Sequence, residues 1–229
     1  MEDRKQPLSK LDLFAGLGET ELAEIAAIGR KRRVRSGEVL WHKGDEGSDL
    51  YVIISGRLKA YATGPDGDDI VFRYMGAGEV AGEIGAFADG KRSASVGTVE
   101  DCELLMIQRR ELFPLLKRFP DIALRMLEAL ATRMIKLSET LEDNNFRPVK
   151  TRLAKCLLSL SQRWPEPARN GDVRIALRLP QGELGDLVGA TRESVNKLVR
   201  QWSADGVLEM HDGAITIKNR AALIALTEA

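Results

Sequence analysis

Sulfur and imidazole ligands, long apolar runs and net charge are all scarce in this sequence. Cys102 and Cys156 are the only cysteines in 229 residues, and two histidines alone could supplement them as metal ligands. An iron–sulfur or zinc centre requires about four clustered ligands, so no metal centre is expected. Both cysteines are interpreted as reduced thiols in the core. No apolar run approaches the roughly 20 residues of a membrane helix, and no apolar signal segment follows residues 1–5. We therefore expect a cytoplasmic protein without a membrane partner.

The absence of net charge is a property of the whole chain and not of its halves. The 34 basic and 34 acidic residues balance, which at first argues against a nucleic-acid partner. Residues 146–229, however, hold 13 Lys and Arg against 9 Asp and Glu, a net +4, whereas residues 1–145 hold 21 against 25, a net −4. This asymmetry suits a DNA-binding C-terminal half. The length allows one large or two modest domains.

The hydrophobic pattern changes near residue 30. In residues 8–30 apolar side chains recur at near-helical spacing and Gly29 follows them, which predicts short helical pieces. From Arg32 to about Arg109, short β-prone runs alternate with glycine turns, and the runs are 39–41, 50–54, 58–61 and 70–74. Many short strands at this spacing predict an all-β sandwich or barrel.

The pattern then becomes helical, with heptad spacing. Apolar residues step by 4, 3, 4, 3 and 4 along Ala123, Leu127, Leu130, Met134, Leu137 and Leu141. This stripe favours the seam of a two-helix dimer, although a core-facing helix in a monomer would show the same pattern. Pro148 disfavours helix at the residue before it, so residues 144–148 are predicted to form a hinge and a domain boundary.

The remaining sequence predicts a winged helix-turn-helix. An amphipathic helix over residues 149–160 is followed by a polar loop at 165–171, a short strand at 177–179 and a helix that begins at Pro180. A turn at residues 189–190 leads to Thr191, a good N-cap for a second helix that runs to about Ala204. Residues 207–210 and 214–217 flank a His-Asp-Gly hairpin signature.

The second helix of this motif has one apolar and one polar face. Its predicted buried face is Val195, Leu198, Val199 and Trp202. In a helix-turn-helix the first residues of the second helix meet base edges, where Arg192 can bind guanine and Glu193 can accept from cytosine. The alternative is the solvated face of an ordinary helix. The predicted DNA-binding residues are Gln181, Thr191, Arg192, Glu193, Asn196, Lys197 and Arg200.

Residues 82–93, Gly-Glu-Ile-Gly-Ala-Phe-Ala-Asp-Gly-Lys-Arg-Ser, combine glycines that permit close backbone approach with a carboxylate and an arginine followed by a hydroxyl. An arginine fork suits phosphate oxygens, and N–H groups at a helix start favour an anion. The segment is therefore interpreted as a sugar–phosphate site. The alternative is a tight turn with a surface Arg–Glu pair.

These motifs together resemble the Crp-Fnr family of bacterial transcription regulators, in its cyclic-AMP receptor branch. Residues 36–38 with Gly44, and 49–53 with Gly56, look like the start of the family's β-roll, and residues 191–197 look like its recognition helix. The resemblance implies an α+β chain of three parts. They are a cyclic-nucleotide-binding β-roll (double-stranded β-helix) at 1–118, a long dimerisation helix at 119–145 and a winged helix-turn-helix DNA-binding domain at 146–229.

The resemblance also implies roles for individual residues. Glu83 matches the glutamate that binds the ribose 2′-hydroxyl, and Arg92 and Ser93 match the pair that binds the cyclic phosphate. Residues whose backbone would approach the ligand are Gly82, Ile84, Gly85 and Ala86. On the long helix, Arg133 matches an arginine near the sugar, and Leu137 and Ser138 stand where the family has the Thr-Ser pair that recognises adenine. Since Leu137 cannot hydrogen-bond, the base stays open, with cyclic AMP or cyclic GMP as the effector and no other cofactor.

The function implied is a homodimeric regulator, controlled by a cyclic nucleotide, that binds a near-palindromic TGTGA-like site on double-stranded DNA and contacts RNA polymerase. One alternative keeps the DNA-binding role with a vestigial pocket and constitutive binding. A nucleotide-processing enzyme is a further alternative, but no second catalytic group accompanies Glu83, so no enzymatic activity is predicted. The last alternative is a regulatory module that binds a nucleotide but does not bind DNA. The Fnr-type cysteine cluster is absent, and His42 is interpreted as a surface or structural residue and not as a haem ligand.

Overall fold

The computed structural model describes residues 8–9, 11–88, 90–168 and 171–227. The chain divides into two compact units, Met1–Thr132 and Arg133–Ala229. The division falls inside α5 (Pro120–Phe146), whereas the helical path itself breaks after Phe146, where Pro148 has extended backbone ahead of α6 (Val149–Arg163). The long helix thus ends inside the predicted hinge at 144–148, but residues 144–146 are helical, and the break at Pro148 follows from proline geometry.

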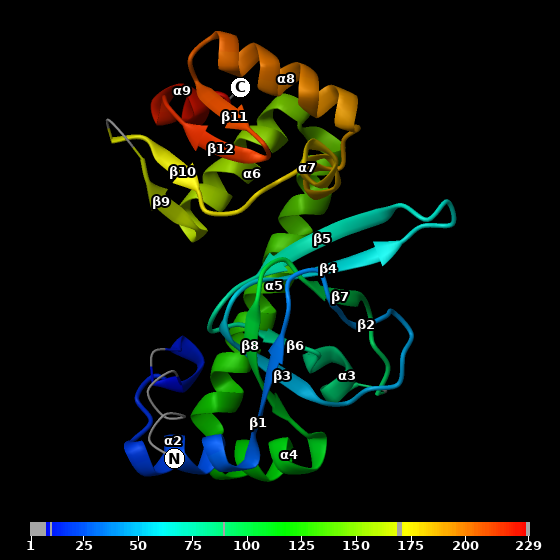
Figure 1. The fold of residues 1–229 in the computed structure, drawn as a ribbon, viewed down its shortest axis with the longest axis vertical. Helices are drawn as coiled ribbons and strands as arrows, with labels where there is room; N and C mark the ends of the chain where they lie inside the picture. The colour runs from blue at the N-terminus through cyan, green and yellow to red at the C-terminus, as the bar shows by residue number, and fades with distance from the viewer. Residues whose placement is uncertain (1–7, 10, 89, 169–170, 228–229) are drawn as a thin grey trace. The chain divides into compact units, whose positions relative to one another are not determined.

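The first unit is built on two four-stranded sheets in which every strand pairing is antiparallel (Figure 1). One sheet has the order β1-β8-β3-β6 and the other β2-β7-β4-β5. The strands are β1 (Arg30–Val34), β2 (Val39–Trp41), β3 (Leu50–Ser55), β4 (Leu58–Thr63), β5 (Asp69–Met75), β6 (Val80–Ala81), β7 (Ser95–Thr98) and β8 (Cys102–Ile107). The predicted β-rich region from Arg32 to about Arg109 is confirmed, and the short helix α3 (Glu83–Phe87) lies within it.

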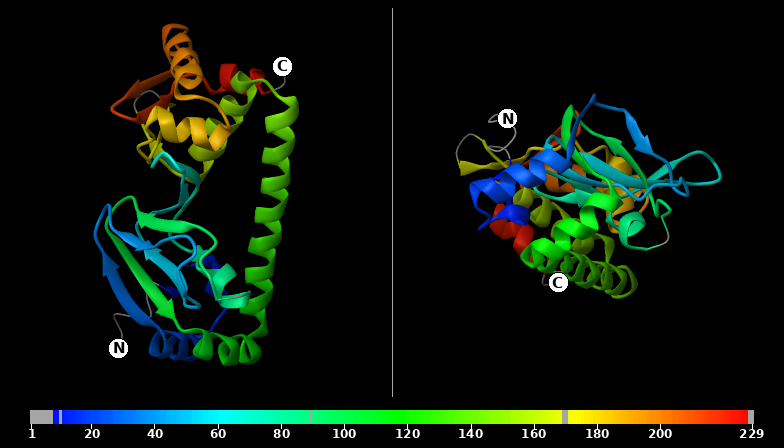
Figure 2. Two further views of the ribbon diagram at one scale, coloured as in Figure 1. Left: turned by 90° about the vertical axis from the view of Figure 1, so that its right-hand side faces the viewer. Right: turned by 90° about the horizontal axis from the view of Figure 1, so that it is seen from below.

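Strand β3 is buried on both faces because it separates two hydrophobic clusters. Side chains alternate along a strand, so Leu50 and Val52 enter one cluster while Tyr51 and Ile53 enter the other. The first cluster also receives the helices η2 (Asp12–Phe14), α2 (Glu19–Ile28), α4 (Arg109–Arg118) and the start of α5. Figure 2 shows α2 and α4 side by side at one end of the strands.

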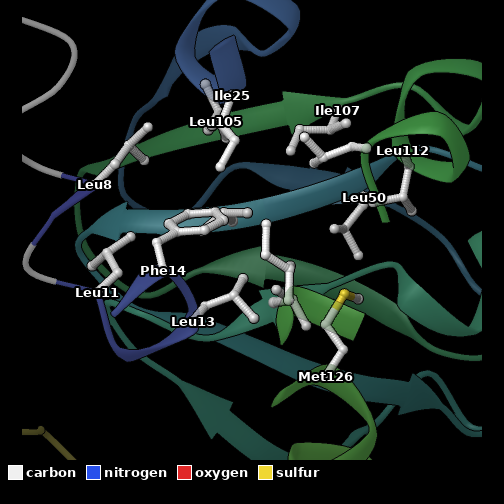
Figure 3. Packing of buried hydrophobic residues seen from close by; sticks show 14 of the residues in the cluster. Leu8, Leu11, Leu13, Phe14, Ile25, Leu50, Leu105, Ile107, Leu112 and Met126 are labelled. Carbon is white, nitrogen blue, oxygen red and sulfur yellow. The ribbon is translucent and has the colours of Figure 1, made fainter. Parts of the chain in front are cut away.

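Figure 3 shows this first cluster from close by, with Phe14 lying among Leu8, Leu11 and Leu13, and Leu50 beside Leu112 on the other side of the cluster. Helix α2 approaches β8 closely at its end. A Cβ on Gly29 would lie 2.4 Å from Leu105 Cδ1, so only glycine fits there. The core thus holds the helices against the β1-β8-β3-β6 sheet, whose strand β6 ends just before residue 82.

The second unit contains a four-stranded sheet of order β11-β12-β10-β9 and the helices α6 to α9 (Figure 1). Its elements after α6 are β9 (Pro165–Pro167), β10 (Val173–Ile175), α7 (Gln181–Val188), α8 (Arg192–Ala204), β11 (Leu208–His211), β12 (Ala214–Ile217) and α9 (Arg220–Ala225). The winged helix-turn-helix is confirmed.

Two local predictions in this unit are wrong. Residues 177–179 form no strand, because Leu177 and Leu179 are buried in the core without joining a ladder. The strand lies earlier, at β10. Part of the predicted loop at 165–171 is strand β9, which pairs with β10 at the edge of the sheet, the one position where prolines such as Pro165 and Pro167 are tolerated.

Candidate functional site

The predicted sugar–phosphate segment begins at a crowded turn. Gly82 has φ +85° and precedes the short helix α3 (Glu83–Phe87). A Cβ on Gly82 would lie 2.4 Å from Arg92 Nη1 and 2.7 Å from the carbonyl oxygen of Asp49. A Cβ on Gly85 would lie 2.5 Å from the carbonyl oxygen of Gly47. The close backbone approach that the sequence predicts is therefore present, and it brings together three segments that are distant in the chain.

The end of the segment is held by a short ladder of backbone hydrogen bonds. The Gly47 N–H donates to the Gly90 carbonyl at 2.7 Å, and the Gly44 N–H donates to the Arg92 carbonyl at 2.8 Å. In return, the Arg92 N–H donates to the Asp45 carbonyl at 2.9 Å. The backbone of Arg92 is thus fixed by Asp45 and Gly44, which lie 47 and 48 positions earlier in the chain.

The Arg92 side chain is buried, with 6% of its surface exposed. Its Nη1 donates to the carbonyl oxygens of Asp49 at 2.9 Å and Gly82 at 3.3 Å. Its guanidinium carbon lies 4.2 Å from the ring centroid of Trp41 and 5.8 Å from that of Tyr51. Desolvation lowers the pKa of Arg92, while the nearby tyrosine and carboxylates oppose that shift. Since arginine stays protonated in proteins, a desolvated cation sits in this turn.

One edge of this cation faces glycine. Both hydrogen bonds that the Arg92 side chain makes to described residues come from Nη1. On the Nε–Nη2 edge, a Cβ on Gly47 would lie 2.5 Å from Nε and 2.8 Å from Nη2, so the Gly47 backbone packs closely against this edge. Glu83 is buried at the start of α3, and Ser93 is exposed next to Arg92. A guanidinium, a carboxylate and a hydroxyl are donors and an acceptor of the kinds that a sugar phosphate requires.

The predicted base-recognition residues lie on α5. Arg133, Leu137 and Ser138 belong to the second unit, whereas residues 82–93 belong to the first. Ser138 Oγ donates to the Met134 carbonyl one turn earlier at 3.1 Å. Leu137 is 62% exposed.

The apolar stripe of α5 is exposed and not packed into the core of its own chain. Met134 is 71% exposed, and Leu127 and Leu141 are similarly open, whereas the helix packs on the core through Ile122 and Met126. A core-facing helix in a monomer would bury the stripe, so that alternative does not describe this chain.

The predicted helix-turn-helix motif is formed by α7, the turn that follows it and α8. Gly189 ends α7 with φ +60°, and the Ala190 N–H donates to the Gly185 carbonyl at 2.9 Å. A Cβ on Gly185 would lie 2.5 Å from the Ala190 carbonyl oxygen, so the turn requires glycine at both positions. Thr191 caps α8, its Oγ1 accepting from the Ser194 N–H at 3.2 Å. The predicted N-cap is confirmed.

Helix α8 has the two faces that the sequence predicts. Val195, Val199 and Trp202 are buried, and Leu198 is half-buried. The exposed residues of the predicted set are Thr191, Arg192, Glu193, Lys197 and Arg200. Gln181 and Asn196 are half-buried and joined, because Gln181 Nε2 donates to Asn196 Oδ1 at 3.3 Å. The exposed face of α8 therefore has four charged side chains, Arg192, Glu193, Lys197 and Arg200, with the Gln181–Asn196 pair beside them.

Sequence reasoning missed several residues that shape these sites. Trp41 and Tyr51 alternate into the strand core, so their contact with Arg92 depends on sheet pairing and has no local signal. In the second unit, Arg152 Nη1 donates to the Val188 carbonyl at 2.6 Å, which anchors the helix-turn-helix turn to α6. Lys155 pairs with Asp143 at 2.7 Å, which ties α6 to the end of α5.

The two cysteines are free thiols. Desolvation raises the pKa of Cys102 to about 11 and that of Cys156 to about 12, so both are protonated at neutral pH. Across the described residues, no group of three or more His, Cys, Asp or Glu side chains is placed to hold a metal ion. None of the helices in the described part of the chain combines the length and the apolar character needed to cross a bilayer.

Known proteins resemble this chain over most of its length. Residues 31–119 match the family model described as a cyclic nucleotide-binding domain, and residues 151–226 match the Crp-like helix-turn-helix domain. A CRP-like cAMP-activated global transcriptional regulator of Mycobacterium tuberculosis is 30% identical over 221 residues, covering 96% of this chain and 95% of that protein.

Two further relatives extend the comparison. The cyclic AMP receptor protein of Thermus thermophilus is 28% identical over 211 residues, covering 92% of this chain and 94% of that protein. The solved structure of CLP, the c-di-GMP responsive global regulator of Xanthomonas campestris, is 27% identical with a TM-score of 0.72, covering 87% of this chain and 99% of that one. The Mycobacterium and Xanthomonas relatives are named as regulators and not as enzymes. With its two domains in this order and such similarity over nearly its whole length, the chain belongs to the Crp-Fnr family of transcription regulators.

Proposed function

We propose that the protein is a homodimeric, DNA-binding transcription regulator controlled by a cyclic nucleotide that binds at residues 82–93. The observation that carries this proposal is the buried Arg92, whose Nε–Nη2 edge makes no hydrogen bond to the described residues and lies against Gly47. A desolvated cation gains most from a phosphate, since charge-assisted hydrogen bonds strengthen where water is excluded.

The other residues of the turn have complementary roles. Arg92 and Ser93 bind the cyclic phosphate, and the buried Glu83 accepts from the ribose 2′-hydroxyl. The backbone from Gly82 to Ala86, including Ile84 and Gly85, closes on the sugar, because glycine at positions 82 and 85 allows the segments to approach within contact.

Cyclic AMP is the first candidate effector and cyclic GMP the second. Two relatives are named as cAMP-activated or cyclic AMP receptor proteins. Arg133 and Ser138 supply polar groups on α5, whereas Leu137 offers only apolar contact to a base. The relative from Xanthomonas responds to c-di-GMP, so this dinucleotide belongs in the same binding panel.

Isothermal titration calorimetry with cyclic AMP, cyclic GMP and c-di-GMP tests the sensing proposal. We expect one cyclic nucleotide to bind the wild type and Arg92→Ala to weaken that binding by at least about 30-fold. The affinity of Arg92→Lys should lie between those of the wild type and Arg92→Ala, because lysine keeps the charge but lacks the two-pronged guanidinium. Arg57→Ala is the control, because Arg57 is a partly buried arginine of the same unit that pairs with Glu100. If no nucleotide binds the wild type, sensing is excluded.

The second candidate is constitutive DNA binding with a vestigial pocket. Two observations favour it: Arg92 already donates to two carbonyls, and Leu137 stands where a hydrogen-bonding residue would select a base. Electrophoretic mobility shifts on a palindromic TGTGA duplex, with and without nucleotide, separate the candidates. Gating predicts tighter binding with the nucleotide, and a vestigial pocket predicts no difference.

Dimerisation through α5 is supported by the exposed stripe. Met134→Lys and Leu141→Lys place charges on the seam and should give monomers in analytical ultracentrifugation. Ile135→Lys is the matched control, since Ile135 is 60% exposed on the same helix but lies off the heptad positions. A dimer retained in both seam variants would reject this interface.

Contact with RNA polymerase is also proposed. Transcription assays with purified polymerase test it, and we expect the protein to change the output of a promoter that carries its site.

A further inference from the structure

We infer that Trp41 is a positioning residue for Arg92, with Tyr51 beside it. Its ring is a platform that fixes the guanidinium in the turn at residues 82–93, where the proposed anionic ligand would bind. This inference rests on the proposed binding of a cyclic nucleotide and names a determinant of that binding outside residues 82–93.

The Trp41 ring is itself held in place. Trp41 ends β2, is 8% exposed, and donates from Nε1 to the Ala94 carbonyl at 3.0 Å, just after the phosphate-binding pair. Beside it, the Tyr51 ring lies with its centroid 5.2 Å from that of Trp41 and its plane tilted by 39°. The indole therefore has a fixed orientation before any ligand arrives.

The arrangement constrains the guanidinium in two ways. The carbonyls of Asp49 and Gly82 hold Nη1, and the indole face lies 4.2 Å from the guanidinium carbon. An arginine that stacks on an aromatic face keeps its N–H donors in the plane of the fork, pointing away from the ring. The ring also stabilises a cation that has lost its water, where cation–π attraction is strongest.

The glycines complete the arrangement. Gly47 and Gly82 leave no space for a Cβ beside the guanidinium, since the added atom would lie 2.5 Å from Nε or 2.4 Å from Nη1. The side chain therefore lies between an aromatic ring and glycine backbone. Removing the ring should let the guanidinium tilt and weaken the paired grip on a phosphate, even though Arg92 itself is intact.

Three variants separate the ring face from other effects. Trp41→Phe keeps an aromatic face but loses the hydrogen bond to Ala94, whereas Trp41→Leu loses both. Tyr61→Leu is the matched control, because Tyr61 is 6% exposed in the same unit and its ring lies beneath Lys59, 5.7 Å away, and not beneath Arg92. Calorimetry with cyclic AMP and cyclic GMP, normalised to the folded fraction from circular dichroism, gives the affinities.

We expect Trp41→Leu to weaken binding on the order of 5- to 30-fold, and Trp41→Phe to remain within about threefold of the wild type. Tyr61→Leu should leave the affinity of the folded protein within about twofold, since distant sites act independently. Wild-type affinity in Trp41→Leu overturns the inference. An equal loss in Tyr61→Leu overturns it too, because the loss would then come from general core damage.

A measurement without ligand keeps the inference separate from the proposed function. The Nε–H resonance of Arg92, assigned by its loss in Arg92→Lys, should be shifted upfield by the ring current of Trp41. Trp41→Leu should remove that shift, and Tyr61→Leu should leave it. If the wild type binds no cyclic nucleotide, the proposed function fails. The resonance then decides the placement of Arg92 alone, and an unchanged shift in Trp41→Leu overturns the inference.

Discussion

Two arginines, one in each unit, are held in different ways. Arg92 is 6% exposed and is held by backbone carbonyls and an aromatic ring that come from distant segments. Arg192 lies exposed in the first turn of α8, with its backbone set by the Thr191 cap. The first site is therefore preorganised by the fold, whereas the second is the surface of one helix and can adjust to DNA. Changes around Arg92 should affect stability and ligand together, and changes around Arg192 should separate them.

The largest effect is expected at Gly82. Alanine there combines a φ of +85° with a Cβ only 2.4 Å from Arg92 Nη1, so Gly82→Ala should lower the free energy of unfolding of the first unit by roughly 2–4 kcal/mol. Urea denaturation measures it. Gly67→Ala is the matched control, because Gly67 has φ +86° with nothing within 4 Å of an added Cβ, and should cost only about 1 kcal/mol. Equal costs would mean that Arg92 gives way easily and is not preorganised.

The next effect concerns the exposed arginine. Arg192→Ala should weaken binding to a TGTGA-like duplex by on the order of 1–3 kcal/mol and relax the preference at one base pair, with no loss of folding stability. Fluorescence anisotropy against single-base variants of the duplex measures both. Gln201→Ala, an exposed change near the end of the same helix, should leave binding unaltered. A uniform loss over all duplexes would show that Arg192 contacts phosphate only.

A smaller effect should appear at Leu137. Leu137→Thr gives the exposed position on α5 a hydroxyl, and a hydrogen bond to a base would change the ratio of cyclic AMP to cyclic GMP affinity by about 10-fold. Competition calorimetry with both nucleotides measures the ratio. Leu137→Val, which stays apolar, should leave the ratio unchanged. A ratio that Leu137→Thr does not alter would place base selection elsewhere.

The smallest effect is expected at Thr191, the N-cap of α8. Thr191→Ala removes the acceptor for the Ser194 N–H and should cost about 1 kcal/mol in the unfolding of the second unit. Ser194→Ala keeps that backbone donor and should cost less, since it removes only the contact between the two hydroxyls at 3.0 Å. Thermal unfolding followed by circular dichroism distinguishes them. A larger cost for Ser194→Ala would assign the cap to the side-chain pair.

Local patterns were enough to predict the elements whose causes are local. The cap at Thr191, the turn at Gly189, the break before Pro148 and the two faces of α8 follow from neighbouring residues. The two failures, the strand placed at 177–179 and the loop at 165–171, share a cause. Leu177 and Leu179 are apolar because the core needs them, and Pro165 and Pro167 are tolerated because β9 lies at a sheet edge. Neither fact is visible in a short window of sequence.

By itself, the sequence determined the order of the two domains, the winged helix-turn-helix, and the candidate set Glu83, Arg92 and Ser93. Periodicity, glycine turns and charge pattern are properties of neighbours, so they can be read without coordinates. The tertiary structure alone decided how Arg92 is held, by Trp41 and by the Asp49 carbonyl, from strands that meet only on folding. It also showed that the stripe of α5 is left exposed by its own chain. Long-range pairing and burial depend on which surfaces meet, and a linear pattern does not contain that information.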